Sequence, residues 1–391
     1  MRTYRDLFRS PEYTPLFLAS SANSAAMAMS GLALGTLVFE ATRSPLLSSL
    51  AMFGPAFAQL VGATLLLSAA DRLPPRTALT GGSLAFALTT ALIALPGLPV
   101  WALFALLAVQ GLVGSVSGGV RYAMLNRILP KDGYILGRSV LNMANGLTQI
   151  VGFAAGGALV ALLSPRGAVL VGAGLYLLSA LAARFGLTAR PASAEGRPSV
   201  AATWRGNVRL LTSPARRYVF VGLWVPNGLI VGCESLFVPY SPSHAGVLLA
   251  VAAVGMLAGD VFAGRFLRPE WRERLGPFLR LLLAAPYLVF ALDPALPVAV
   301  AAITLAAVGY CSTLLLQERL MALTPDELQG QALGLFSSGM LAMQGVGATL
   351  AGTVAQFTGP TAGMAVMAAA SVAVTLAIAP GLRAPVPAEA V

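Results

Sequence analysis

Twelve long apolar stretches follow one another along the chain, and this series limits the fold more than any other feature. A helix needs about 20 mostly apolar residues to cross the hydrocarbon core of a bilayer. The stretches, numbered here as segments 1 to 12, lie near residues 14–39, 45–70, 77–95, 99–121, 137–163, 167–187, 217–240, 245–264, 277–292, 294–317, 331–356 and 360–381. We therefore expect an all-α integral membrane protein with 12 transmembrane helices.

The composition places the chain in the membrane class and offers little for catalysis. Of the 391 residues, 57% are hydrophobic and 10% charged, whereas about a quarter of a soluble domain is charged. Cys233 and Cys311 lie in apolar stretches, and His244 has no potential metal ligands nearby in sequence. We expect no metal site, no cofactor and no enzyme, because no nucleophile–base pair, ligand cluster or phosphate loop is evident.

The basic residues are confined to one side of the predicted membrane. All but two of the 25 Lys and Arg residues lie in the N-terminus or in links after even-numbered segments, the exceptions being Arg43 and Arg166. Since basic residues stay on the cytoplasmic side during insertion, both termini should be cytoplasmic and the protein multi-pass in the inner (cytoplasmic) membrane. This asymmetry accounts for the net charge of +10 without a nucleic-acid partner.

A polar stretch and an internal repeat divide the chain into halves. Residues 188–214 form the longest polar stretch, and within it Val200 to Leu211 has the pattern of a helix lying at the inner membrane surface. We expect an N-terminal six-helix bundle (1–187), a cytoplasmic linker (188–214), a C-terminal six-helix bundle (215–382) and a disordered tail (383–391). The repeat makes the bundles pseudo-symmetric, because four residues recur 195 positions later: Pro130, Gln149, Gly152 and Gly157 match Pro325, Gln344, Gly347 and Gly352.

The link after segment 2 resembles a signature of the major facilitator superfamily. That pattern is G-x-x-x-D-R-x-G-R-R, and Asp71, Arg72 and Arg76 match it while Leu67 and the pair Pro74–Pro75 depart from it. The resemblance covers the whole chain and implies two six-helix bundles with a substrate site between them near the bilayer midplane. It also implies that Asp71 and Arg72 hold an inner gate closed.

Segment 5 resembles the G-x-x-x-G-G part of a pattern found in proton-coupled exporters of this superfamily. Gly152, Gly156 and Gly157 match, with Phe153 where the exporters have proline. Small residues of this kind would let helices from the two halves approach closely. Together with the N-terminal sequence, this pattern is similar to the drug-exporter branch that contains macrolide and siderophore exporters.

Polar and methionine side chains recur at helical spacing on segments 1, 5, 7 and 11. In the functional interpretation they line a central cavity that adapts to varied ligands. In the alternative they bond neighbouring helices, each contributing about 0.6–2 kcal/mol. The candidate cavity residues are Asn23, Met27, Asn142, Asn145, Gln149, Trp224, Asn227, Met340 and Gln344.

Two acids lie inside apolar segments and are the candidates for proton coupling. Glu234 lies toward the outer side of segment 7, where the alternative is a solvated acid or a pair with Arg43. Asp260 lies toward the inner side of segment 8, where the alternative is a gating contact with basic residues. Arg121, at the end of segment 4, would contact an anionic substrate, pair at the inner gate or extend to the inner surface.

These features favour a monomeric secondary transporter that exports a small, moderately hydrophobic molecule by proton antiport. Its partners would be the substrate, protons and the lipid bilayer, and alternating access of the two bundles would move the substrate. One alternative is an importer, by symport or uniport, of a nutrient such as a sugar or peptide. An alternative of another class is a non-transporting membrane sensor or assembly protein on the same fold.

Overall fold

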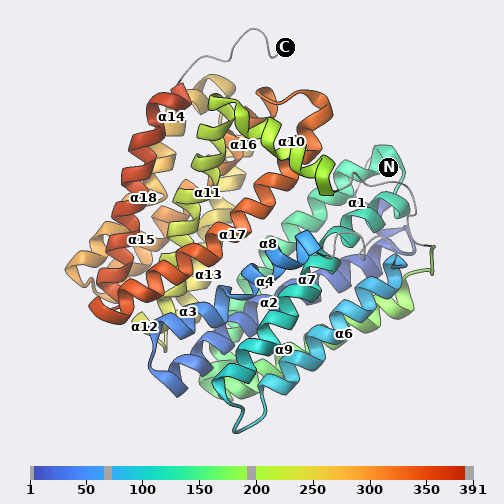
Figure 1. The fold of residues 1–391 in the computed structure, drawn as a ribbon. Helices are drawn as coiled ribbons and strands as arrows, with labels where there is room; N and C mark the ends of the chain where they lie inside the picture. Colours follow the sequence, from blue (N-terminus) through green and yellow to red (C-terminus); the bar gives the residue numbers. More distant parts are fainter. Residues whose placement is uncertain (1–3, 66–72, 192–199, 384–391) are drawn as a thin grey trace. The chain divides into compact units, whose positions relative to one another are not determined.

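The computed structural model describes residues 4–65, 73–191 and 200–383, and these residues are almost entirely helical (Figure 1). Ten helical stretches in this part are long and apolar enough to cross a membrane, and Val100–Val116 is a shorter apolar one. Each of the twelve predicted segments coincides with one helix or with a consecutive pair or triplet. The all-α membrane fold expected from the sequence is therefore confirmed.

The helices of the first half are α1 (Tyr4–Phe8), α2 (Tyr13–Thr42), α3 (Pro45–Phe53), α4 (Pro55–Leu65), α6 (Pro75–Ile93), α7 (Val100–Ile128), α8 (Lys131–Leu162) and α9 (Pro165–Gly186). Those of the second half are α10 (Val200–Thr212), α11 (Pro214–Ser235), α12 (Phe237–Tyr240), α13 (Ala245–Arg265), α14 (Pro269–Leu282), α15 (Leu296–Val308), α16 (Ser312–Ala322), α17 (Asp326–Thr358) and α18 (Pro360–Arg383). Two 3₁₀ helices, η1 (Ala285–Leu292) and η2 (Gly309–Cys311), lie among them.

Several predicted segments are interrupted or longer than expected. Segment 2 divides into α3 and α4 at Gly54, because Pro55 has no N–H to continue the helical ladder. Segments 9 and 10 contain the 3₁₀ helices η1 and η2 where continuous α-helix was expected. The helix of segment 4 continues past its expected end at residue 121 to Ile128, so Arg121 lies within α7.

The chain forms two compact units, each of which includes a short piece from the other half of the sequence. Unit 1 consists of Met1–Thr42, Gly54–Glu195 and Ser243–Ala250, and unit 2 of Arg43–Phe53, Gly196–Pro242 and Val251–Val391. Helix α3 thus belongs to unit 2, and the start of α13 to unit 1. The bundle and linker boundaries expected from the sequence, and the place of α10 at the membrane surface, stay predictions.

Unit 1 is organised around α2, which packs against α8 and α9. Ser179 of α9 donates a hydrogen bond to the Ala19 carbonyl at 2.9 Å and lies 3.1 Å from the Ser83 hydroxyl of α6. The buried Gln110 amide of α7 donates to the hydroxyls of Thr89 and Thr90 of α6. These bonds join four helices of one unit inside an apolar environment.

In unit 2 the backbones of α11 and α17 touch. A Cβ added to Gly347 of α17 would overlap the carbonyl of Gly228, and one on Gly232 would lie 2.5 Å from the carbonyl oxygen of Gly347. Small residues at a crossing allow this approach, which maximises van der Waals contact between helices in lipid. The glycines are therefore a steric requirement of the α11–α17 crossing.

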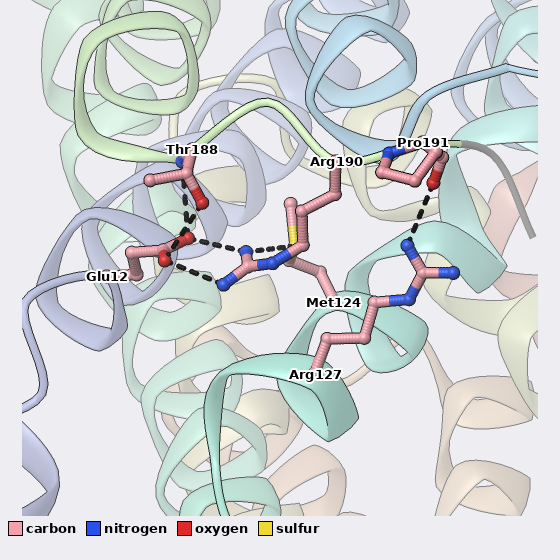
Figure 2. A network of polar contacts seen from close by, with 6 residues as sticks. All are labelled: Glu12, Met124, Arg127, Thr188, Arg190 and Pro191. Atoms are coloured by element: carbon pink, nitrogen blue, oxygen red, sulfur yellow. Dashed lines mark hydrogen bonds and ion pairs between the residues drawn. The ribbon is translucent and has the colours of Figure 1, made fainter.

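A polar network fastens the end of α9 to the start of α2 in unit 1 (Figure 2). The Glu12 carboxylate accepts hydrogen bonds from both terminal nitrogens of Arg190, at 2.6 and 2.7 Å, and from the backbone N–H and hydroxyl of Thr188. Burial raises the pKa of Glu12, but the bonds from Arg190 and Thr188 outweigh it and hold this pKa below its usual value of 4.5.

We expect Gly347→Ala to destabilise the protein, because its methyl group would be forced into the Gly228 backbone. Overpacking of this kind costs about 1–3 kcal/mol. Thermal unfolding of the purified protein in detergent measures the effect. Gly334→Ala on the same helix is the matched control, since nothing lies within 4 Å of the position its Cβ would take. Equal melting temperatures for the two variants would contradict the described crossing.

We expect Glu12→Gln to lower stability at neutral pH by about 1 kcal/mol, a modest figure because the pair is partly exposed. Since the folded pKa of Glu12 is lowered, its contribution is present above 4.5 and is lost as the pH falls through the folded value. The melting temperatures of wild type and variant should therefore converge in acid. Arg190→Gln should be non-additive with Glu12→Gln, and additive losses would show that the two side chains act separately.

Candidate substrate and proton sites

Trp224 and Asn227 of α11 are both directed at α17. The Trp224 indole N–H donates to the Phe336 carbonyl at 3.0 Å, and its ring occupies the space where a Gly339 side chain would lie. The Asn227 side chain is buried, and its amide lies 3.4 Å from the sulfur of Met340. In this structure both candidates join the two helices, as the alternative interpretation expects of such residues.

Glu234 lies on the same predicted stripe but has different neighbours. It is half-buried, and among the described residues its carboxylate has no hydrogen bond or ion pair, including with Arg43. Its electrostatic neighbours are Cys233, Tyr287 and Tyr310. Trp224 and Asn227 thus have partners on α17, whereas Glu234 interacts electrostatically with Tyr287 of η1 and Tyr310 of η2.

Asp260 of α13 reaches the same neighbourhood from another helix. One carboxylate oxygen, Oδ1, is buried without a hydrogen-bond partner among the described residues. The charge of Asp260 acts on Tyr310 and Cys311, and Tyr310 also senses Glu234. The two predicted acids therefore share one neighbour in unit 2. Tyr310 is absent from the sequence-based candidates, although Gly309 and Ser312 beside it already mark a polar interruption in segment 10.

The candidates of unit 1 fall into two groups. Asn145 of α8 accepts a hydrogen bond from the Ser24 hydroxyl of α2 at 2.9 Å, so it joins two helices. Asn142, Gln149 and Met27 are exposed, with 66% of the Met27 surface accessible, whereas Asn23 is half-buried. Gln149 and Met27 are accessible to a ligand, while Asn145 already has a helix–helix bond.

The segment 5 glycines are the points where α8 meets the backbones of two other helices, α2 and α13. A Cβ on Gly152 would lie 2.8 Å from the Ala25 carbonyl oxygen, and one on Gly156 would lie 3.1 Å from the Met29 Cα. Both therefore pack against α2 of the same half, which corrects the expectation that they meet the other half of the chain. Gly157 instead meets Gly246, which comes from segment 8 and belongs to unit 1.

The inner-gate signature is only partly visible. Asp71 and Arg72 lie outside the described residues. Arg76, at the start of α6, donates a hydrogen bond to the carbonyl of Arg184 in the last turn of α9. Arg121 lies half-buried within α7. Of the remaining unit 2 candidates, Met340 is buried and Gln344 half-buried on α17.

With the fold and these positions established, comparison with known proteins identifies the family. The sequence profile of the Major Facilitator Superfamily matches residues 16–315, and the chain belongs to this family. It is a multi-pass membrane transporter by family rather than an enzyme. No curated protein matches the sequence.

Solved structures of other transporters share the fold at low sequence identity. A POT family transporter in complex with a thioalcohol-conjugated peptide is 11% identical, with a TM-score of 0.75 over 95% of this chain and 96% of that one. The nucleoside transporter NupG is 14% identical, with a TM-score of 0.76 over 95% and 99%. A bacterial homolog of the human lysosomal transporter Spinster is 14% identical, with a TM-score of 0.72 over 96% of both chains. At this level of identity the likeness shows the fold alone.

The two groups of unit 1 candidates should respond differently to truncation. We expect Asn145→Ala and Ser24→Ala each to lower the free energy of unfolding by about 0.6–1.7 kcal/mol, and with it the melting temperature. The two effects should be non-additive, because both substitutions remove the same hydrogen bond. Gln149→Ala should leave the melting temperature unchanged and raise the apparent KM for transport. A loss of stability in Gln149→Ala as large as in Asn145→Ala would contradict this division.

Proposed function

We propose that this protein exports a small, moderately hydrophobic molecule, such as a drug or natural product, from the cytoplasm in exchange for protons. It would work as a monomer in the inner membrane with both termini cytoplasmic. Alternating access of the two halves would expose the substrate site first to one side and then to the other. Asp71, Arg72 and Arg76 would hold the inner gate, as the signature in the link after segment 2 suggests.

The observation that carries this proposal is the pair of acids without counter-charges in unit 2. Neither Glu234 nor Asp260 has an ion-pair partner among the described residues. An ionised acid at the centre of a membrane helix costs about 2.5–3.5 kcal/mol. Protonation removes this cost, so the charge state of the two acids biases the conformations that expose them to water or hide them.

The substrate preference follows from the exposed candidates. Met27 and Gln149 combine a polarizable thioether with an amide, and neither carries a charge. Thioether side chains repack around apolar ligands of different shapes. The partial exporter pattern at Gly152, Gly156 and Gly157 favours the outward direction by resemblance.

A second candidate function is import of a polar nutrient. The similar structures include a POT family transporter in complex with a peptide and a nucleoside transporter, which gives this direction some support. A sensor or assembly protein that binds a ligand without moving it is the remaining candidate of another class.

We expect cells of an exporter-deficient bacterial host to accumulate less ethidium when they express the wild-type protein. Glu234→Gln should restore accumulation to the level of the empty-vector host, because a neutral amide cannot alternate between charge states. A protonophore should have the same effect on the wild type. Ethidium fluorescence in loaded cells, followed over time, measures all three.

Glu40→Gln is the matched control, since Glu40 is exposed at the end of α2 and should not affect efflux. Efflux that is insensitive to Glu234→Gln but sensitive to Asp260→Asn would move the coupling role to Asp260. Uptake of labelled peptides or nucleosides by the same cells, without any efflux of ethidium or related compounds, would favour the importer.

A further inference from the structure

The residues that join segment 8 to segment 9 have a composition that the transport proposal does not use. Residues 265–280 contain five arginines and two glutamates, a net charge of +3. Three large aromatic side chains lie among them and are exposed: Phe266 at 65%, Trp271 at 53% and Phe278 at 70%. Arginine and tryptophan together at the end of a membrane helix are typical of contact with lipid headgroups.

Packing holds this part of the chain in place from one side. A small core cluster lies beneath it, formed by four buried residues: Ala263, Leu267, Leu279 and Cys311. Pro269 begins α14, where its fixed φ suits the first helical turn. The Trp271 N–H donates a hydrogen bond to the Arg268 carbonyl at 3.0 Å. The exposed side chains therefore extend from a defined turn and helix.

Three of the exposed side chains share one face of α14. Trp271, Arg274 and Phe278 lie at i, i+3 and i+7, which places them in line along a helix, and all three are exposed. Leu275 and Leu282 of the same helix pack against the core cluster instead. We call the three residues the α14 stripe.

The order of side chains along α14 follows the layers of a phospholipid. The apolar span that includes most of α14 begins at Arg274, so Arg268 and Trp271 precede it and Phe278 lies within it. From Arg268 to Phe278 the rise is about 15 Å at 1.5 Å per residue. An indole is favoured at the level of the headgroups, and a phenyl ring among the acyl chains. The long side chain of Arg274 can extend back to the phosphate level.

The end of α13 adds a further arginine and a pair of aromatic rings. The apolar span Ala245–Arg265 ends on Arg265, which is exposed. Phe262 and Phe266 are exposed one turn apart, with ring centroids separated by 6.3 Å. Both helix ends thus carry exposed arginine at the boundary of an apolar span, next to exposed aromatic rings.

The first half of the chain folds without an equivalent of the α14 stripe. Arg265 matches Arg72 at an offset of 193 residues. At the same offset, the three positions of the stripe hold small residues in α6: Ala78, Gly81 and Ala85. The stripe is therefore an addition to the second half and is not required to form the helix.

We propose that the α14 stripe, with Arg265 and Arg268, binds an anionic phospholipid of the inner leaflet. The guanidinium groups donate hydrogen bonds to the lipid phosphate, Trp271 lies at the headgroup level, and Phe278 packs against an acyl chain. The net positive charge favours an anionic headgroup over a zwitterionic one, which carries its own compensating cation. Only the choice of leaflet rests on the proposed orientation, with both termini cytoplasmic. The lipid preference is independent of transport.

The test measures how brominated lipids quench Trp271 when the purified protein is in vesicles of phosphatidylcholine and phosphatidylglycerol. Bromine on the acyl chains of one lipid quenches nearby indoles, and the difference between wild type and Trp271→Phe isolates Trp271. We expect phosphatidylglycerol to be enriched at Trp271 by about fivefold or more over its share of the vesicle, because each arginine near an anionic surface favours binding by about this factor. High salt should reduce the enrichment.

The double variant Arg268→Gln/Arg274→Gln should bring the enrichment close to one. Arg5→Gln/Arg9→Gln is the matched control, because it removes two charges from exposed arginines before segment 1 and should retain the enrichment. Equal quenching of wild-type Trp271 by the two lipids at equal mole fraction would overturn the proposal. An equal loss of enrichment in the two double variants would also overturn it. Melting temperatures confirm that each variant is folded.

A labelling experiment separates the lipid site from the proposed orientation. The native Cys233 and Cys311 are buried, so a membrane-impermeant maleimide should report on Arg268→Cys. We expect labelling only after the cells are opened. Labelling in intact cells would contradict the cytoplasmic orientation, and with it the inner leaflet, while the quenching in vesicles tests the site itself. Neither measurement involves ethidium efflux, so a failure of the export proposal is distinguishable from a failure of this one.

Discussion

The contact between the backbones of α11 and α17 determines what the polar side chains of unit 2 can do. Gly228 and Gly347 bring the helices so close that Trp224 and Asn227 reach partners on α17, the Phe336 carbonyl and the Met340 sulfur. In lipid such bonds are favourable because no water is present to form a hydrogen bond with an unsatisfied polar group. The same crossing leaves Glu234 without a partner on α17. At this crossing Trp224 and Asn227 therefore hold the two helices together, whereas Glu234 can gain or lose a proton without breaking a bond between them.

Unit 1 contains an equivalent arrangement, which extends the sequence repeat to the level of contacts. Gly152 meets the Ala25 carbonyl on α2, as Gly347 meets the Gly228 carbonyl on α11. Gly152 and Gly347 were matched by the 195-residue repeat, whereas Ala25 and Gly228 are different residue types at an offset of 203. At Ala25 and at Gly228 the backbone carbonyl makes the contact, which explains why the correspondence of these two residues is hard to find in the sequence. A backbone group makes the contact, so the side chain there is restricted only in size.

The hydropathy pattern predicted the helices well because the cost of exposing polar groups to lipid acts on every residue of a span. It did not predict where the helices break without proline. The 3₁₀ turn at Gly309 lies against Leu279 and Leu283, which are distant in sequence. Helical periodicity likewise placed Asn227 and Glu234 on one stripe. Helix α11 contains Pro226, which removes a backbone donor and favours a bend, and the two side chains have different neighbours. Tyr310 was missed as a neighbour of the two acids because Glu234 and Asp260 lie on other helices, far from it in sequence.

The contrast between Glu12 and Glu234 shows how the same side chain takes a structural or a dynamic role. Glu12 receives hydrogen bonds from Arg190 and from Thr188, so taking up a proton would weaken several charge-assisted bonds at once. Its charge is therefore part of the fold. Glu234 and Asp260 have no such donors among the described residues, and protonation would cost them no bond. A carboxyl can report the proton concentration only where the fold does not already depend on its charge. Unit 2 meets this condition twice, at Glu234 of α11 and at Asp260 of α13.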